Sequence, residues 1–188
     1  IAGPAVAQNY PTKPIRMLVP FPPGGTGEFL ARGITPRMGE FVGQQFIVDF
    51  RSGAGTTLAA GLAAAAPADG YTVFIQAITT QAITETLYTK LPYDTRKDFA
   101  SVGLIADVPL VLASHPSVPV RNAKDVADLS HTRAGKLDFA SPGVGTSSHF
   151  AVELFKMVSK ADLTHIPYKG AGQSTVDVMA GFVPLVID

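Results

Sequence analysis

The chain has 188 residues, with 15 Lys and Arg against 15 Asp and Glu, so its formal net charge is zero. That balance argues against a nucleic-acid-binding protein and against a polybasic membrane anchor. Hydrophobic residues make up 46% of the chain and charged residues 16%, which excludes an intrinsically disordered protein. Cysteine is absent, which excludes disulfides, thiolate metal sites and a cysteine nucleophile.

The first nine residues differ in character from the rest. Ala5-Val6-Ala7 is an A-x-A sequence of the kind that signal peptidases cleave. We therefore interpret residues 1–9 as a signal-peptide remnant or tail, with cleavage near Ala7 and export to the periplasm. A chance Ala-rich tail is the alternative, and residues 1–9 are left out of the fold prediction.

The first half of the chain alternates predicted strands and helices. Short apolar runs between prolines or turn residues predict strands, and apolar residues at helical spacing predict helices. In chain order these are strand 15–19, helix 28–41, strand 46–50, an Ala-rich helix within 53–66 and strand 71–75. This order is typical of a parallel, doubly wound sheet.

The second half repeats the alternation. The predicted elements are strand 104–114, helix 125–129, strand 137–140, a helix opened by the loop 143–149, strand 163–166, helix 173–179 and strand 182–188. We therefore expect an α/β protein of two lobes. Residues 10–110 form the first lobe and residues 111–188 part of the second, which is incomplete because the chain stops on an apolar strand.

Three predicted strand-to-helix loops are rich in Gly, Ser and Thr: 20–27, 51–57 and 141–149. In open α/β sheets, ligands bind beyond the carboxyl ends of the strands, where such loops lie. The free N–H groups of a following helix attract anions. These residues can also simply turn the chain and cap the helices. Three such loops in one topology favour binding of a carboxylate or phosphate.

Motifs for catalysis are weaker. Residues 143–146 lack the lysine of a phosphate-binding P-loop, and residues 51–57 do not complete a dinucleotide fingerprint. Ser148 and His149 are neighbours on one predicted helix, so their side chains point apart and form no relay. The four histidines show no i, i+4 pair for a metal. We expect binding rather than catalysis, with no cofactor and no metal.

Several motifs in order resemble one known family. They lie at residues 10–16, 19–25, 67–72, 90–94, 97–99, 145–149 and 167–170. The chain resembles the tripartite tricarboxylate transporter receptors, which are Bug- or TctC-type periplasmic solute-binding proteins. The resemblance spans residues 10–188. It departs from the family pattern at Glu28, where members usually have Asp, and at Ser52, where they usually have Pro.

The resemblance implies a two-lobe Venus-flytrap receptor in which each lobe is a mostly parallel sheet with flanking helices. Such receptors are not enzymes. They capture small carboxylated metabolites (dicarboxylates, tricarboxylates, acidic amino acids or aromatic acids) for uptake or sensing, and can deliver them to a tripartite tricarboxylate transporter permease. Members are longer, so the chain is expected to be truncated at its C-terminus and to self-associate. The alternative function is an α/β enzyme acting on a small organic acid.

The resemblance also implies a ligand site between the lobes, which close about a hinge in residues 104–114. The first lobe would offer backbone amides from the loop 22–26 and hydroxyls from a loop around Thr79 and Thr80. The second lobe would offer the helix start at residues 145–147. The implied ligand-binding residues are Phe21, Pro23, Gly24, Gly25, Thr26, Thr79, Thr80, Gly145, Thr146, Ser147, His149 and Asp188.

Overall fold

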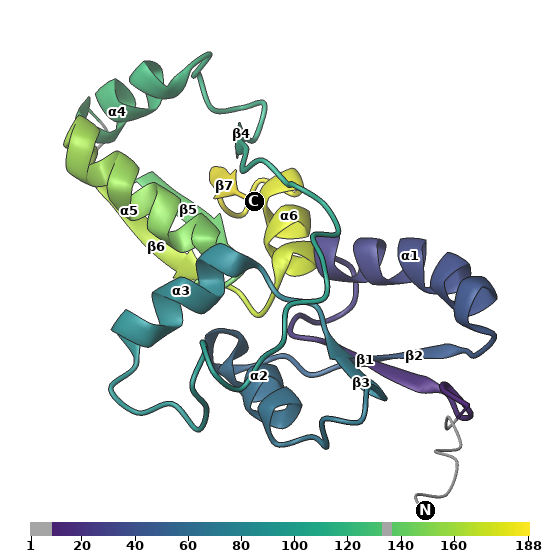
Figure 1. The fold of residues 1–188 in the computed structure, drawn as a ribbon. Helices are drawn as coiled ribbons and strands as arrows, with labels where there is room; N and C mark the ends of the chain where they lie inside the picture. Colours follow the sequence, from purple (N-terminus) through teal and green to yellow (C-terminus); the bar gives the residue numbers. More distant parts are fainter. Residues whose placement is uncertain (1–8, 133–136) are drawn as a thin grey trace, which may run out of the picture.

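The computed structural model describes residues 9–132 and 137–188, so the predicted cleavage near Ala7 lies outside the described residues. The chain forms two separate sheets with helices around them (Figure 1). One sheet has the strand order β2-β1-β3 and the other the order β4-β7-β5-β6. The predicted α/β fold with two mostly parallel sheets is therefore confirmed.

The first sheet is parallel throughout. Its central strand β1 (Ile15–Val19) pairs with β2 (Phe46–Phe50) and β3 (Thr72–Phe74). Because β1 is covered on both faces, it is a continuous apolar run, and Leu18 and Val19 are fully buried. The helices of this part are α1 (Thr26–Val42), α2 (Thr57–Ala64) after a 3₁₀ turn (Ala54–Thr56), and α3 (Ile78–Leu87).

The second sheet is parallel except at one edge. β5 (Leu137–Ser141) pairs in parallel with β6 (Leu163–Pro167) and β7 (Leu185–Ile187), and β4 (Leu112–Ser114) runs antiparallel to β7. Its helices are α4 (Ala123–Thr132), α5 (Ser147–Ser159) and α6 (Ala171–Met179). Leu137, Phe139 and Leu185 are fully buried at the centre of its core. Residues 15–74 and 112–187 thus supply the two sheets.

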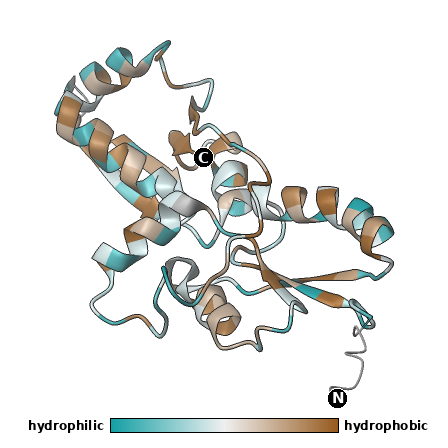
Figure 2. Cartoon of the chain, in the orientation of Figure 1, coloured by the Kyte–Doolittle hydropathy of each residue, from teal (hydrophilic) through white to brown (hydrophobic). Residues whose placement is uncertain are grey.

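Two predicted elements are wrong. Residues 78–87, expected as a loop, form α3. The predicted strand 104–114 is a strand only at Leu112–Ser114, because residues 101–110 have no strand to pair with in the part of the chain that the structure describes. Figure 2 shows hydrophobic residues along this connector, in which Val102 and Leu104 are 90% and 86% exposed. The division into lobes at residue 110 and the hinge remain proposals.

Glycines lie at several of the contacts between the two parts of the molecule. A Cβ placed on Gly172 would lie 2.9 Å from the carbonyl oxygen of Gly24, and one on Gly170 would lie 2.6 Å from the Pro22 ring. These contacts bring the beginning of α6 against the loop that precedes α1 (Figure 1). In residues 9–132 and 137–188, no helix has the length and hydrophobicity needed to cross a membrane.

Candidate functional site

A groove of about 820 Å³ lies between the beginnings of α1 and α6. Its size is within the range of small-molecule sites. One wall comes from the first sheet's side and the other from α6 and the residue after β7. Among the lining residues are Gly24, Gly25, Thr26, Glu28, Ala171, Gly172 and Asp188. The structure therefore brings four of the predicted ligand-binding residues together, Gly24, Gly25, Thr26 and Asp188.

Both helices that open on this groove begin at a glycine. Gly25 precedes α1 and Gly170 precedes α6, and within the described ranges neither helix start receives a side-chain cap. The first N–H groups of a helix have no intrahelical acceptor, and they attract negative charge. We call these two positions the open helix starts. They provide the groove with donors that suit a carboxylate.

An internal carboxylate already uses one of the donors that we assigned to the ligand. Glu28 Oε2 accepts the Gly24 N–H at 2.7 Å, and Arg32 donates to Glu28 Oε1. The hydrogen bonds from Arg32 and then Gly24 hold the pKa of the Glu28 carboxyl below its usual value. The Gly24 amide therefore faces a fixed negative charge, which leaves the amides after it as the better donors for a ligand.

Asp188 adds a second acidic group to the groove. It follows β7 directly and is half-buried, and burial raises the pKa of its carboxyl. A raised pKa means that this carboxyl takes up a proton more readily than an exposed one. Asp188 could then donate a hydrogen bond to a carboxylate, or when ionised accept one from an ammonium group.

The second-lobe loop, residues 143–147, lies apart from this groove. Gly145 and Thr146 are buried. A Cβ on Gly145 would lie 2.8 Å from Leu87 at the end of α3, and the Val144 carbonyl approaches Gly55. The loop therefore packs against the first lobe. Unlike the open helix starts, α5 is capped by its own side chain, because Thr146 Oγ1 accepts the His149 N–H at 3.3 Å.

The predicted hydroxyls of the first lobe do not form part of the groove. Thr79 is exposed in the first turn of α3, and Thr80 is buried. In the described structure, Thr80 Oγ1 has no hydrogen-bond partner. Of the remaining predicted residues, Phe21 and Pro23 lie in the loop after β1, Phe21 half-buried and Pro23 exposed. Ser147 and His149 are half-buried in the first turn of α5.

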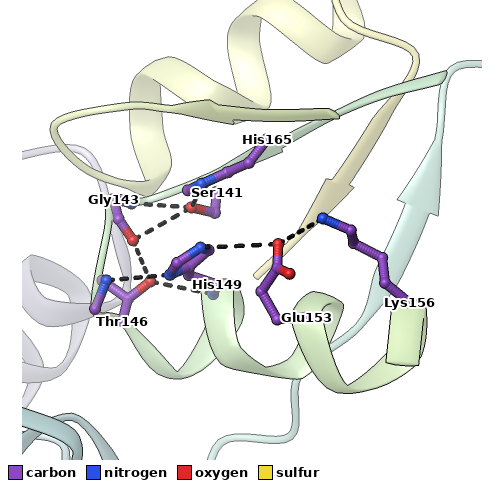
Figure 3. Close-up of polar contacts among 8 residues, drawn as sticks. Ser141, Gly143, Thr146, His149, Glu153, Lys156 and His165 are labelled. Carbon is purple, nitrogen blue, oxygen red and sulfur yellow. Dashed lines mark hydrogen bonds and ion pairs between the residues drawn. The ribbon is translucent and has the colours of Figure 1, made fainter. Parts of the chain in front are cut away.

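Sequence reasoning missed two features. The first is the open start of α6, signalled only by Gly170 and Gly172 after a strand. The second is a hydrogen bond of 2.7 Å between Ser141 Oγ and His165 Nε2, residues 24 positions apart (Figure 3). Ser141 is fully buried, so its hydroxyl cannot reach a substrate. Over the residues described, no group of three His, Asp or Glu could hold a metal ion.

Two α/β parts that meet at glycine-lined loops, with a groove between the beginnings of α1 and α6, define a two-lobed α/β protein. The family assignment is direct. The chain belongs to the tripartite tricarboxylate transporter family receptors, whose family model matches residues 30–188. The predicted family is thereby confirmed.

Individual relatives agree with this assignment. The chain is 38% identical over 179 residues to a protein encoded in the tcbD–tcbE intergenic region of Pseudomonas sp. strain P51, covering 95% of this chain and 53% of that one. Among solved structures it is similar to Rpa4515 of Rhodopseudomonas palustris with adipate, at a TM-score of 0.90 and 37% identity. It is also similar to MatC of Rhodopseudomonas palustris with bound malate, at a TM-score of 0.87 and 30% identity.

Both structural matches cover 95% of this chain, but only 60% of Rpa4515 and 61% of MatC. The chain thus spans a little over half the length of the curated relative it matches and three fifths of these two solved structures.

Proposed function

We propose that the protein is the ligand-capturing part of a periplasmic receptor for a small carboxylated metabolite: a dicarboxylate, a tricarboxylate, an acidic amino acid or an aromatic acid. The observation that carries the proposal is the pair of open helix starts, which face one groove from two lobes. Two structural relatives are described with adipate and with malate, both dicarboxylates. No bound cofactor or catalytic step is part of the proposal.

In this proposal the ligand carboxylate lies at the amides of Gly25 and Thr26 and at the start of α6, beside Asp188. Phe21, Pro23 and Gly24 shape the first-lobe loop around it. The second-lobe loop with Gly145, Thr146, Ser147 and His149 would contribute to the site only by leaving its present contacts with Leu87 and Gly55. Thr79 and Thr80 contribute only if α3 shifts, because Thr80 is buried.

Isothermal titration calorimetry of the purified chain with adipate, malate, glutamate and benzoate tests the proposal. Adipamide has the length of adipate without its charge and is the control ligand. We expect heat from at least one carboxylate and none from adipamide, because the donors in the groove select a negative charge. If a folded chain, verified by circular dichroism, gives no heat with any of the four acids, the proposed function is wrong.

The two lobes, residues 10–110 and 111–188, are proposed to move as two bodies about a hinge in residues 104–114. The exposed connector and the few glycine contacts between the lobes support this. Small-angle scattering with and without the bound acid should show a decrease in radius of gyration on binding. An unchanged radius would contradict hinge closure.

Export is proposed because the chain is similar to a solved periplasmic transporter and to the periplasmic binding protein BugD. Sequencing the N-terminus of the protein recovered from the periplasm should give a sequence that starts after Ala7.

Delivery to a tripartite tricarboxylate transporter permease is proposed from the family description. Deleting the gene in cells that keep the permease should abolish uptake of the bound acid, whereas unchanged uptake would contradict delivery.

Self-association of the 188-residue chain is proposed from its exposed apolar side chains. Val102 and Leu104 in the connector, Phe41 at the end of α1 and Phe182 before β7 are each at least 80% exposed. Apolar surface of this kind favours association. Sedimentation velocity should show dimers or larger species that increase with concentration, and the double variant V102S/L104S should reduce them. A concentration-independent monomer would exclude self-association.

A further inference from the structure

Three aromatic rings are stacked in the second lobe, beneath the second-lobe loop. The His165 ring lies between Phe139, at a centroid distance of 4.8 Å, and His149, at 4.2 Å, and the ring planes are within 16° of parallel. The register of the sheet explains the stack. His165 on β6 is the partner of Phe139 on β5, and Ser141 lies two residues further along the same face of β5. His149 reaches this face from α5.

Each imidazole also holds part of the second-lobe loop (Figure 3). His165 Nε2 is bonded to Ser141 Oγ at 2.7 Å, and Ser141 Oγ accepts the Gly143 N–H at 3.2 Å. His149 Nδ1 accepts the Gly145 N–H at 3.3 Å. The loop is therefore held at two points. His165 holds Gly143 through Ser141, and His149 holds Gly145 directly.

Adding a proton to either ring opposes this arrangement. Nδ1 of His149 can accept the Gly145 N–H only when it has no proton. A charge on both rings would place two cations 4.2 Å apart in a buried stack. Burial, followed by the proximity of His149, lowers the pKa of His165 to about 4, and burial also lowers the pKa of His149.

The charged groups that act on the pair both come from α5. Glu153 Oε1 lies 4.0 Å from His149 Nε2 and is bonded to Lys156 at 2.9 Å, so its charge is largely balanced. β7 carries only apolar side chains against α5. The ionisable groups of the other helices packed on α5 have local partners or lie at a helix end. On the α3 side, Glu85 is paired with Arg96. On α4, Lys124 is paired with Asp128, Asp125 accepts the Arg121 N–H, and His131 lies in the last turn.

We propose that His165 is a positioning residue for the second-lobe loop, which it holds in its binding conformation through Ser141 and His149 only while both imidazoles are uncharged. The inference rests on the proposed function. The sign of the pH dependence follows from linkage. A disengaged loop leaves the imidazoles free to bind protons near their ordinary pKa of 6.5, whereas the engaged loop keeps the pKa of His165 at about 4. Affinity for the ligand should therefore fall as the pH falls from 6.5 towards 4.

Calorimetric titration at several pH values between 7.5 and 4.5, with adipate and malate as probes, tests the inference. His165→Ala should lower the affinity about tenfold at pH 7.5, the equivalent of one lost hydrogen bond. His165→Gln keeps a neutral partner for Ser141, so it should restore most of the affinity and show a flatter pH profile. His131→Gln, at the exposed end of α4, should follow the unmodified protein at every pH.

Protonation of the ligand itself affects all variants equally, so the ratio of affinities between the unmodified protein and each variant isolates the protein's contribution. Equal pH profiles for the unmodified protein and His165→Gln would overturn the inference. So would an affinity that rises in acid, since that would mean that charged imidazoles attract the carboxylate directly.

A readout without ligand separates this inference from the proposed function. Nuclear magnetic resonance of the free chain between pH 7 and 4 should show the amides of Gly143 and Gly145 titrating together with the rings of His149 and His165. If the amides move with the rings but no acid binds, the positioning role stands and the proposed function fails. If the rings gain protons while the amides stay unchanged, the positioning role is wrong.

Discussion

The beginnings of α1 and α5 look alike in the sequence and behave differently in the structure. Each helix follows a parallel strand and a glycine-rich loop that ends in Gly-Thr. In α5, Thr146 occupies the cap position and its hydroxyl accepts a backbone N–H of its own helix. In α1, Gly25 occupies the cap position and Thr26 is already the first helical residue. A shift of one residue decides whether a helix start is capped by its own side chain or left open.

The largest effect should come from giving α1 a cap of its own. In Gly25→Asp, the new carboxylate would lie at the amides proposed for the ligand and would repel a bound acid. A charged hydrogen bond contributes roughly 1.5–3 kcal/mol, so we expect the affinity for adipate to fall by about a hundredfold. Calorimetry measures the change.

Gly25→Asn is the matched control, because it has the same size and also caps a helix but carries no charge. A Cβ at this position would lie 3.3 Å from the Cβ of Ala171, so both variants meet the same steric contact. Equal losses in the two variants would mean that crowding, rather than charge, is responsible, and the comparison between α1 and α5 would lose its functional meaning.

A smaller effect should follow from separating the two open helix starts. Gly172→Ala places a methyl group 2.9 Å from the Gly24 carbonyl oxygen, which forces the lobes apart. Overpacking of this kind costs about 1–3 kcal/mol, partly offset by the better helix propensity of alanine. Urea denaturation should show a lower free energy of unfolding. In Gly33→Ala the new Cβ meets no described atom within 4 Å, so that helical control should be more stable, and a stabilised Gly172→Ala would contradict the contact.

The smallest change should come from removing the cap of α5. Thr146→Val loses the hydroxyl that accepts the His149 N–H and donates to the Gly143 carbonyl at 2.8 Å. Loss of an N-cap costs about 1 kcal/mol of unfolding free energy. Thr146→Ser keeps the hydroxyl and should stay within a few tenths of a kcal/mol. Should the two variants prove equally stable in urea, Thr146 would not serve as a cap, and the two helix starts would be equivalent.

The strands were predictable where the sequence itself marks their ends. Residues 15–19 lie between two prolines, and residues 46–50 form a short run that is apolar except for Asp49, so both strands were predicted with their observed bounds. Residues 104–111 are also mostly apolar, but Asp107 and Pro109 interrupt them, and a strand needs a neighbour, which no local pattern reveals. Helix α3 was missed because its threonines and isoleucines have low helix propensity, which packing overrides.

The candidate site was predictable in part for a similar reason. Glycine-rich loops after strands pointed to Gly24, Gly25 and Thr26, which line the groove. The ring stack around His165 depends on how β6 pairs with β5. The position of the open start of α6 beside the groove depends on how the two lobes meet. Such relations between distant segments become visible only once the chain is folded.

The contact between Gly24 and Gly172 has an entropic consequence. The main chain of one lobe lies directly against that of the other at Gly24 and Gly172, so no side chain separates the two helix starts at this contact. A ligand that bridges them would immobilise no flexible side chain at this contact. Since each immobilised side chain costs about 0.5–1.5 kcal/mol of binding free energy, a small acid with few atoms could bind there without that loss.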